Sequence, residues 1–183
     1  MKKYLSSHSC LSLLVSTLLL PSAFASDGTI TITGTITDTT CTIAVNDGNA
    51  DGTVTLPTVS AKTLAASGDV AGATPFSIGL SSCSGTSLGT ATSYFEPGAY
   101  VDTESGRLNV DSATGSATNI QVQLLNSERE AIVAGAATGG QNDISTDIES
   151  GSGTLNYYAQ YYATGVSTAG SVSTQVSYTI VYE

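Results

Sequence analysis

The sequence has no tryptophan, one histidine (His8), one methionine (Met1), and only 5 lysine and arginine residues among 183. Against these stand 15 aspartate and glutamate residues, which give a formal net charge of −10. Nucleic-acid binding needs clustered basic side chains to neutralise phosphates, so this composition excludes it. It also excludes electrostatic attraction to an anionic membrane surface. Hydrophobic residues make up 40% of the chain, which is enough for a folded core.

The first 25 residues have the three features of a secretory signal peptide. Lys2 and Lys3 form a positive n-region, Leu11–Leu20 is a short apolar run, and Ala23–Ala25 is a small-x-small cleavage site. We therefore expect export with cleavage after Ala25. The apolar run is too short to span a bilayer, and no later segment is long or apolar enough, so we expect no insertion into the membrane.

The chain that remains after cleavage lacks the side chains that most catalysis uses. Residues 26–183 contain no histidine, and their basic residues are Lys62, Arg107 and Arg129, against the same 15 acidic residues. Without a histidine base, we expect no enzyme activity and no cofactor. The one catalytic alternative is a serine–lysine pair around Lys62. Lys62 lies in a polar stretch, and most such lysines are solvated surface residues.

Two cysteines, Cys41 and Cys83, remain in residues 26–183. An even pair in an exported protein indicates one disulfide. The alternative, a metal site with two cysteine ligands, has no histidine partner.

A second metal-like pattern begins at Asp47, where Asp47, Asn49 and Asp51 precede Gly52 in the order D-x-N-x-D-G. A calcium loop would need a bidentate glutamate at position 58, which is Thr58. We therefore expect a turn there and no metal site.

Apolar residues recur with period two along most of the chain, which is typical of β-strands. Threonine, valine, isoleucine and tyrosine dominate these stretches, and Gly-, Ser- and Asp-rich clusters separate them. The pattern predicts an antiparallel β-sandwich of immunoglobulin-like size over roughly Thr39 to Glu183. Its expected strands are residues 41–45, 53–56, 76–82, 92–101, 119–125, 154–162 and 175–182, with one short helical turn within Ala61–Ala66.

The N-terminal arm, residues 26–38, has the most regular alternation. Its apolar row is Ile30, Ile32, Gly34 and Ile36, and threonines face the other way. It can be an ordinary first strand of the sandwich, or a detachable strand whose isoleucines enter pockets elsewhere. Glycine weakens a strand unless something must approach closely there, and the arm precedes Cys41, so the second interpretation is favoured.

With these features in order, the sequence resembles the pilin subunits of chaperone–usher pili, and among them the major subunit of type 1-like fimbriae. The resemblance covers the whole chain after the signal peptide. It rests on the alternating arm with Gly34, on the cysteine pair, and on the Leu155–Ala163 segment. The C-terminal end matches as well, because Gly170 is fourteenth from the end and Tyr182 is penultimate.

The resemblance implies an incomplete immunoglobulin-like β-sandwich that lacks its last strand and carries an N-terminal donor-strand extension. Ile30, Ile32, Gly34 and Ile36 would fill a groove in a neighbouring copy, by addition of a strand. The groove and the chaperone contact would involve the C-terminal residues Gly170, Val176, Tyr178, Ile180, Tyr182 and Glu183. The carboxylate of Glu183 would anchor basic residues of a periplasmic pilus chaperone.

The implied function is a structural subunit of an adhesive pilus, a homopolymer that is assembled at an outer-membrane usher and supports cell adhesion. The implied location is a fimbrium on the surface of a Gram-negative bacterium, reached through the periplasm. A minor, adaptor or tip subunit that binds host glycans is the alternative. Tyr157, Tyr158, Tyr161 and Tyr162 provide only a weak signal for a sugar platform. A third possibility is a self-contained secreted sandwich, which would be stable as a monomer.

A single chain that lacks a strand has two choices for its arm. We expect it either to leave residues 26–37 outside its own sheets or to fold them back into its own groove.

Overall fold

The computed structural model describes residues 29–86 and 88–183. The chain divides into two units, residues 1–35 and residues 36–183, which are described separately. The signal peptide predicted for residues 1–25 lies outside the described residues. In the first unit, residues 29–35 have no regular secondary structure and their side chains are exposed. Residues 29–37 thus lie outside the chain's own sheets, which is one of the two arrangements expected for a single chain. A lone extended segment has no ladder of hydrogen bonds to stabilise it as a strand.

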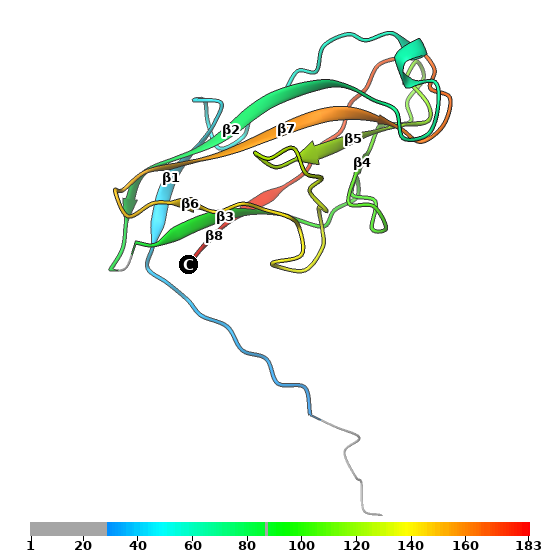
Figure 1. Ribbon diagram of the computed structural model, residues 1–183. Coiled ribbons are helices and arrows are strands. Elements are labelled where there is room, and N and C mark those ends of the chain that lie inside the picture. Colours follow the sequence, from blue (N-terminus) through cyan, green and yellow to red (C-terminus); the bar gives the residue numbers. More distant parts are fainter. Residues whose placement is uncertain (1–28, 87) are drawn as a thin grey trace, which may run out of the picture. The chain divides into compact units, whose positions relative to one another are not determined.

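The second unit is a sandwich of two antiparallel sheets (Figure 1). One sheet has five strands in the order β1-β2-β7-β5-β4, and the other has three in the order β6-β3-β8. The element bounds are β1 Thr40–Val45, η1 Ala61–Leu64, β2 Val70–Ser84, β3 Thr90–Phe95, β4 Leu108–Asn109, β5 Ile120–Leu125, β6 Thr146–Asp147, β7 Gly153–Ala163 and β8 Tyr178–Tyr182.

Strand β7 is the centre of the five-stranded sheet and pairs with β2 on one side and β5 on the other. Its alternation directs Leu155, Tyr157 and Ala159 into the space between the sheets, where each is at most 4% exposed. The ring of Tyr157 packs edge-on against Phe95 of the opposite sheet, at 5.3 Å between centroids. Its hydroxyl shares a 2.7 Å hydrogen bond with Ser93. The period-two pattern therefore builds the core from both layers.

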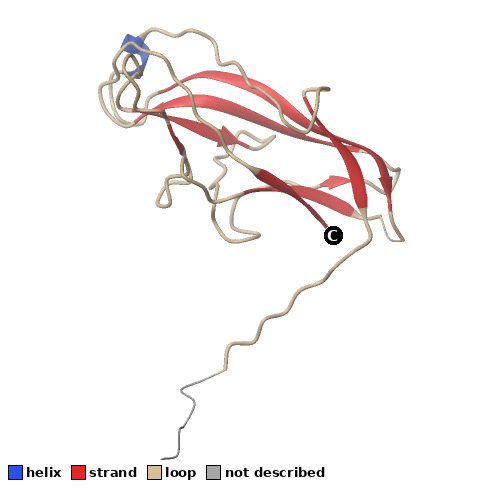
Figure 2. Cartoon of the chain, turned by 180° about the vertical axis from the view of Figure 1, so that it is seen from behind, coloured by secondary structure: helices blue, strands red, loops and turns tan. Residues whose placement is uncertain are grey.

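Most strands expected from the sequence are present, but one is missing and two are shorter than expected. The helical turn in Ala61–Ala66 is confirmed as the 3-10 helix η1, which is the blue segment in Figure 2. Residues 53–56 were expected to be a strand and are not one, because no backbone hydrogen bond joins them to a neighbour in the described chain. Likewise, β3 ends at Phe95 rather than at residue 101, and β8 begins at Tyr178 rather than at residue 175.

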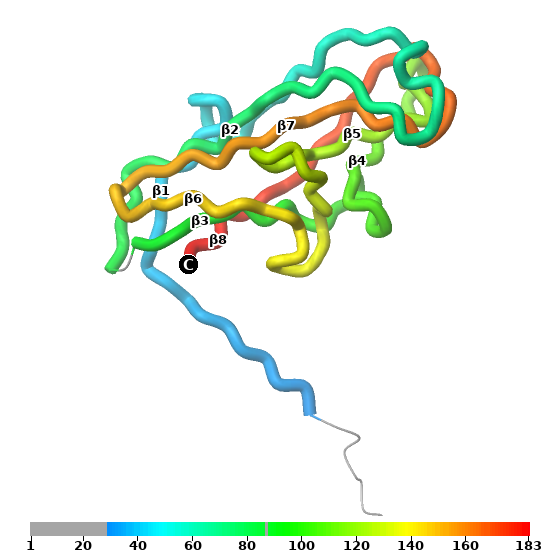
Figure 3. Tube along the Cα trace, viewed as in Figure 1, coloured from blue at the N-terminus to red at the C-terminus, as the bar shows by residue number. Residues whose placement is uncertain are grey.

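Gln141 is a buried polar residue in the long connection between β5 and β6, whose path can be followed in Figure 3. Its amide oxygen accepts from the Phe95 N–H at 2.9 Å, and its amide nitrogen donates to the Phe95 carbonyl at 2.8 Å. The same nitrogen lies 3.1 Å from the Ala136 carbonyl. Gln141 thus satisfies the backbone at the end of β3, where strand pairing stops.

We expect Gln141→Leu to lower the free energy of unfolding by about 1–3 kcal/mol, because it leaves the buried N–H of Phe95 without a partner. The Phe95 carbonyl still accepts from the Gly135 N–H at 3.0 Å. Denaturant unfolding followed by circular dichroism measures this loss. Gln175→Leu, at an exposed position, is the matched control and should change stability by less than about 0.5 kcal/mol. Equal effects of the two substitutions would contradict this role for Gln141.

Candidate functional site

Strand β8 is the edge of its sheet, because it pairs with β3 on one side only. Glu183 exchanges backbone hydrogen bonds of 2.8 and 2.9 Å with Thr90, and the Ser177 carbonyl accepts from the Glu96 N–H at 2.9 Å. In an antiparallel pair, the residues that bond to the partner strand alternate with residues whose peptide groups point away from it. The N–H and C=O groups of Tyr178, Ile180 and Tyr182 therefore face away from β3.

Along this edge, buried or half-buried side chains alternate with exposed ones. Ile180 is buried, and Val172, Val176, Tyr178 and Tyr182 are half-buried and pack against the core cluster. Residues 173, 175, 177 and 179 are exposed. The C-terminal segment thus presents unpaired peptide groups beside a row of incompletely covered apolar side chains.

A second segment, residues 53–56, has the same character. Val54 and Leu56 are half-buried against the same core cluster, while Thr53 and Thr55 are exposed. No backbone-to-backbone hydrogen bond joins residues 51–59 to other parts of the described chain. This segment is strand-like in its side chains and unpaired in its backbone. Such edges are templates for pairing with another strand.

Two tyrosine hydroxyls connect β8 to the N-terminal side of the sandwich. The Tyr178 hydroxyl donates to the Ala50 carbonyl at 2.7 Å. The Cys41 N–H donates to the Tyr182 hydroxyl at 3.1 Å. Cys41 is itself joined by the disulfide to Cys83, so β1 is fixed covalently to β2 at this end. The unpaired edge is therefore held near β1 at two points.

The structure brings together some of the residues predicted to form a site and separates others. Val176, Tyr178, Ile180 and Tyr182 lie on one face of the C-terminal segment, as described above. Gly170 instead lies against the backbone of Ser116 and Ala117, where any Cβ would collide with it. Its need to be glycine thus has a local cause, inside the sandwich.

The apolar side chains of the arm are the most exposed in the described chain. Ile30 and Ile32 are 90% exposed, and Ile36 is 100% exposed. A Cβ at Gly34 would meet no atom within 4 Å. Large apolar side chains in such positions mark a segment whose packing partner lies in another molecule or another state.

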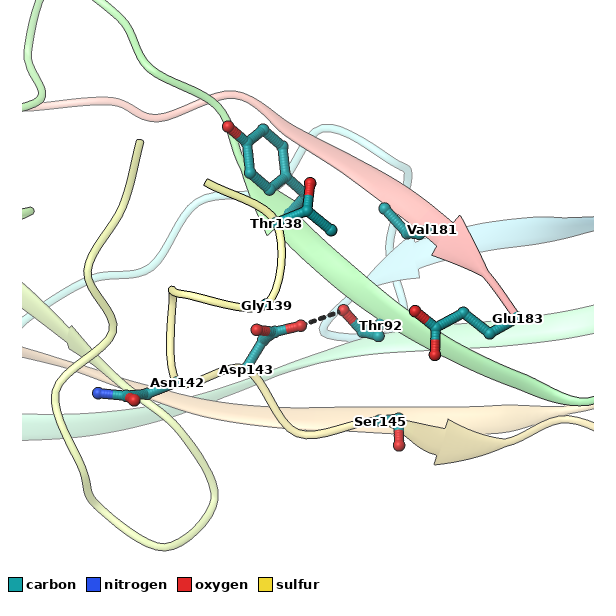
Figure 4. Close-up of a pocket in the computed structure, with 9 residues that line it drawn as sticks. Thr92, Thr138, Gly139, Asn142, Asp143, Ser145, Val181 and Glu183 are labelled. Atoms are coloured by element: carbon teal, nitrogen blue, oxygen red, sulfur yellow. Dashed lines mark hydrogen bonds between the residues drawn. The ribbon is translucent and has the colours of Figure 1, made fainter. Parts of the chain in front are cut away.

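Glu183 lines a polar cavity of about 470 Å³ between β3, β8 and the loop before β6 (Figure 4). Thr92 donates to an oxygen of Asp143 at 2.6 Å within it. The lining side chains are hydroxyls, an amide, carboxylates, Tyr94 and Val181. Within residues 29–86 and 88–183, no three His, Cys, Asp or Glu side chains are grouped as metal ligands. The Asp47–Gly52 stretch forms a turn.

The four tyrosines of β7 divide between the two faces of the sheet. Tyr157 is buried in the core, and Tyr161 is half-buried on the same face. Tyr158 and Tyr162 face outward, and each is covered by an arginine: Arg129 lies 4.3 Å and Arg107 4.0 Å from the respective ring centroids. One face of each of these two rings is therefore occupied by a guanidinium. No helix in the described part of the chain is long and apolar enough to cross a membrane.

Comparison with known proteins gives consistent results. The family model of the type-1 fimbrial protein, A (FimA) matches residues 56–183. The chain is 48% identical to the major fimbrial subunit SMF-1 of Stenotrophomonas maltophilia over 87% of this chain and 95% of that protein. It is 45% identical to the F17 fimbrial protein of Escherichia coli over 87% and 89%.

Among solved structures, the P pilus rod subunit PapA matches with a TM-score of 0.57 and 18% identity. The match covers 78% of this chain and 99% of that one. At this identity the likeness concerns the fold alone. It agrees with an immunoglobulin-like sandwich that lacks a strand.

The Tyr178 hydroxyl gives the site a testable pH dependence. Burial, and then the charge of Asp51, raises the pKa of Tyr178 above the ordinary tyrosine value of 10.0. A raised pKa in the folded state means that the contribution to stability is complete below pH 10 and disappears as the pH rises through the folded pKa. We expect wild type to be more stable than Tyr178→Phe at pH 7–9, and this advantage to shrink above pH 10. Parallel denaturant titrations measure it. A constant difference across this range would contradict the raised pKa of Tyr178.

Proposed function

This chain belongs to the type-1 fimbrial protein family and is a structural subunit of a surface pilus, and we propose that its copies are joined by donor-strand exchange. In this process the N-terminal arm of one subunit adds to the unpaired edge of the next. The observation that carries the proposal is the match between two incomplete features of the same chain. The edge strand β8 has no neighbour on its outer side. The arm has the alternating side chains of a strand but pairs with no sheet of its own chain.

The two features are complementary in their chemistry. The peptide groups of Tyr178, Ile180 and Tyr182 face away from β3, so an added strand can extend the ladder there. The isoleucines of the arm alternate in the same period as the half-buried residues beside that edge. A slip by one residue would turn the threonines of the arm inward, so the alternation also fixes the register.

The magnitudes favour a durable joint. Burial of each isoleucine side chain contributes about 1.5–3 kcal/mol. Each hydrogen bond of the ladder adds roughly 0.5–1.5 kcal/mol net. The added strand becomes part of the recipient's core, so its release resembles unfolding. The persistence of the fibre would then be kinetic.

Before assembly, the exposed edge needs protection. We propose that the subunit passes through the periplasm after removal of residues 1–25, bound to a pilus chaperone, and is incorporated at an outer-membrane usher. The chaperone would cover the edge formed by Val176, Tyr178, Ile180 and Tyr182, with Glu183 beside it. A free subunit exposing this edge would be prone to aggregation, which is the physical reason for such a partner.

The relatives also weigh against a minor, adaptor or tip role. The protein that is 48% identical over 95% of its length is described as a major fimbrial subunit. The family consists of structural subunits, which agrees with the sparse catalytic residues of this chain.

We expect Ile32→Asp or Gly34→Trp to abolish fibre formation, since one places a charge in the apolar row and the other places a large side chain where the row has none. Electron microscopy and heat-resistant multimers on gels provide the measurement. Thr33→Asp, which adds the same charge on the opposite side of the arm, is the control and should still polymerise. Fibres of normal yield from the Ile32 variant would refute the role of the arm.

Recovery of the subunit from the periplasm should depend on a co-expressed pilus chaperone. We expect at least a tenfold loss of soluble subunit when the chaperone is left out, because the edge at β8 is then uncovered. A peptide of residues 29–38 added during refolding should restore solubility. A soluble, stable monomer without either strand would show instead that the sandwich is self-contained.

A further inference from the structure

The outward face of the five-stranded sheet has an unusual composition for so acidic a chain. Strands β2, β5 and β7 contain no aspartate or glutamate, although the chain has 15 such residues. On this face Tyr162 lies directly opposite Gln121, and Tyr158 lies opposite Leu125. Surfaces rich in tyrosine and arginine and depleted of acidic residues are typical of protein–protein interfaces.

Two arginines are fixed on this face by the tyrosines. The Arg107 guanidinium stacks on Tyr162, and its Nε donates to the Gln121 side chain at 2.7 Å. Gln121 in turn donates to Asn109 at 2.9 Å. The Arg129 guanidinium stacks on Tyr158. A stacked guanidinium keeps its in-plane N–H groups available for a carboxylate, so both arginines are pre-organised to bind one.

Among the described residues neither guanidinium forms an ion pair, and the side-chain interactions of the two arginines are the ring contacts and the Gln121 bond. Hydrogen bonds from Ser105 are the main cause that lowers the pKa of Asp102, and the charge of Arg107 adds only a small part. Glu128 and Glu130 adjoin Arg129 in sequence and are exposed. Two of the three basic residues in residues 29–183, Arg107 and Arg129, can therefore bind a carboxylate of another molecule.

The opposite layer of the sandwich offers such acids. Asp147, at the end of β6, and Glu149, just after it, are exposed, and Asp143 lies in the loop before them. The chain has no basic residue between Arg129 and its last residue, Glu183. We call residues 143–149 the acidic segment; its strand β6 belongs to the three-stranded sheet and not to the arginine-bearing one (Figure 1).

We propose that the face formed by Arg107, Arg129, Tyr158 and Tyr162 docks onto the acidic segment of another copy in the same fibre. The proposal rests on the pilus function above, and it is separate from strand addition, because the edge that would accept the arm lies at β8. The two surfaces differ and lie on opposite layers, so the contact is heterologous and repeats without closing on itself. It also offsets repulsion between neighbouring copies, which is large for a subunit with 15 acidic and so few basic residues.

Zero-length cross-linking of assembled fibres tests the contact directly. We replace Arg129→Lys, which keeps the charge and supplies an amine, and treat the fibres with a carbodiimide. The reagent activates a carboxylate, the amine displaces the resulting urea, and an amide forms with net loss of one water. Asn142, next to the acidic segment, is hydrogen-bonded to Asn126 and Ala131 in the loop that carries position 129. Fibres are therefore assembled from a mixture of isotope-labelled and unlabelled copies, and only links that join the two kinds count as contacts between copies.

We expect mass spectrometry to find links from position 129 to Asp147 or Glu149 at least ten times more often than links from Lys62 to the same residues. Lys62 is the internal control, since it is an exposed basic residue on η1, outside the strands that form the arginine face. Links from position 129 that are absent, or no more frequent than those from Lys62, would overturn the proposal.

The double variant Arg107→Gln/Arg129→Gln separates this contact from strand addition. We expect it to form heat-resistant multimers like wild type but fibres that are measurably narrower and more flexible by electron microscopy. Unchanged fibre dimensions would overturn the proposal. Unchanged dimensions together with lost binding to an acidic polysaccharide such as heparin would assign the face to that partner instead. If wild-type fibres gave no heat-resistant multimers, the strand-exchange mechanism itself would fail.

Discussion

The unpaired edge at β8 is the constraint on which the rest of the molecule depends. Backbone N–H and C=O groups that lose contact with water without gaining a partner raise the free energy of the folded state. A sheet edge beside a half-covered core must therefore be paired or covered, or the protein will aggregate through it. In the mechanism that we propose, the chain meets this constraint with the arm at its other end, which adds to the edge of a neighbouring copy. Each copy would then complete its sandwich only when it joins the fibre.

The two sheets differ in how their backbones are held. In the five-stranded sheet, whose edge strands are β1 and β4, a disulfide joins β1 to β2. In the three-stranded sheet, β8 is an edge strand, and the Gln141 side chain satisfies the backbone of β3 at Phe95. Side chains from both sheets already form the core beside the β8 edge, so an added strand would meet a core that is partly in place.

The sequence predicted the sandwich well because its alternation is a local property. Residues 41–45, 119–125 and 154–162 are strands as expected, and Cys41 and Cys83 are bonded. The two-residue strands β4 and β6 were missed, since two residues show no period. Residues 53–56 were wrongly expected to be a strand, since alternation reports which side chains turn inward and not whether a backbone partner exists. The stacking of Arg107 on Tyr162 could not be predicted either, because it depends on the register between β5 and β7 and on the path of the loop before β4.

The stacking of Arg107 on Tyr162 and of Arg129 on Tyr158 affects how well a surface fibre resists proteases. Trypsin-like proteases cut after lysine or arginine and must draw that side chain into a deep specificity pocket. In residues 29–183 only Lys62, Arg107 and Arg129 offer such a bond, and the two arginines already lie on aromatic rings. The scarcity of basic residues that leaves the chain so acidic therefore also leaves little for these enzymes to cut.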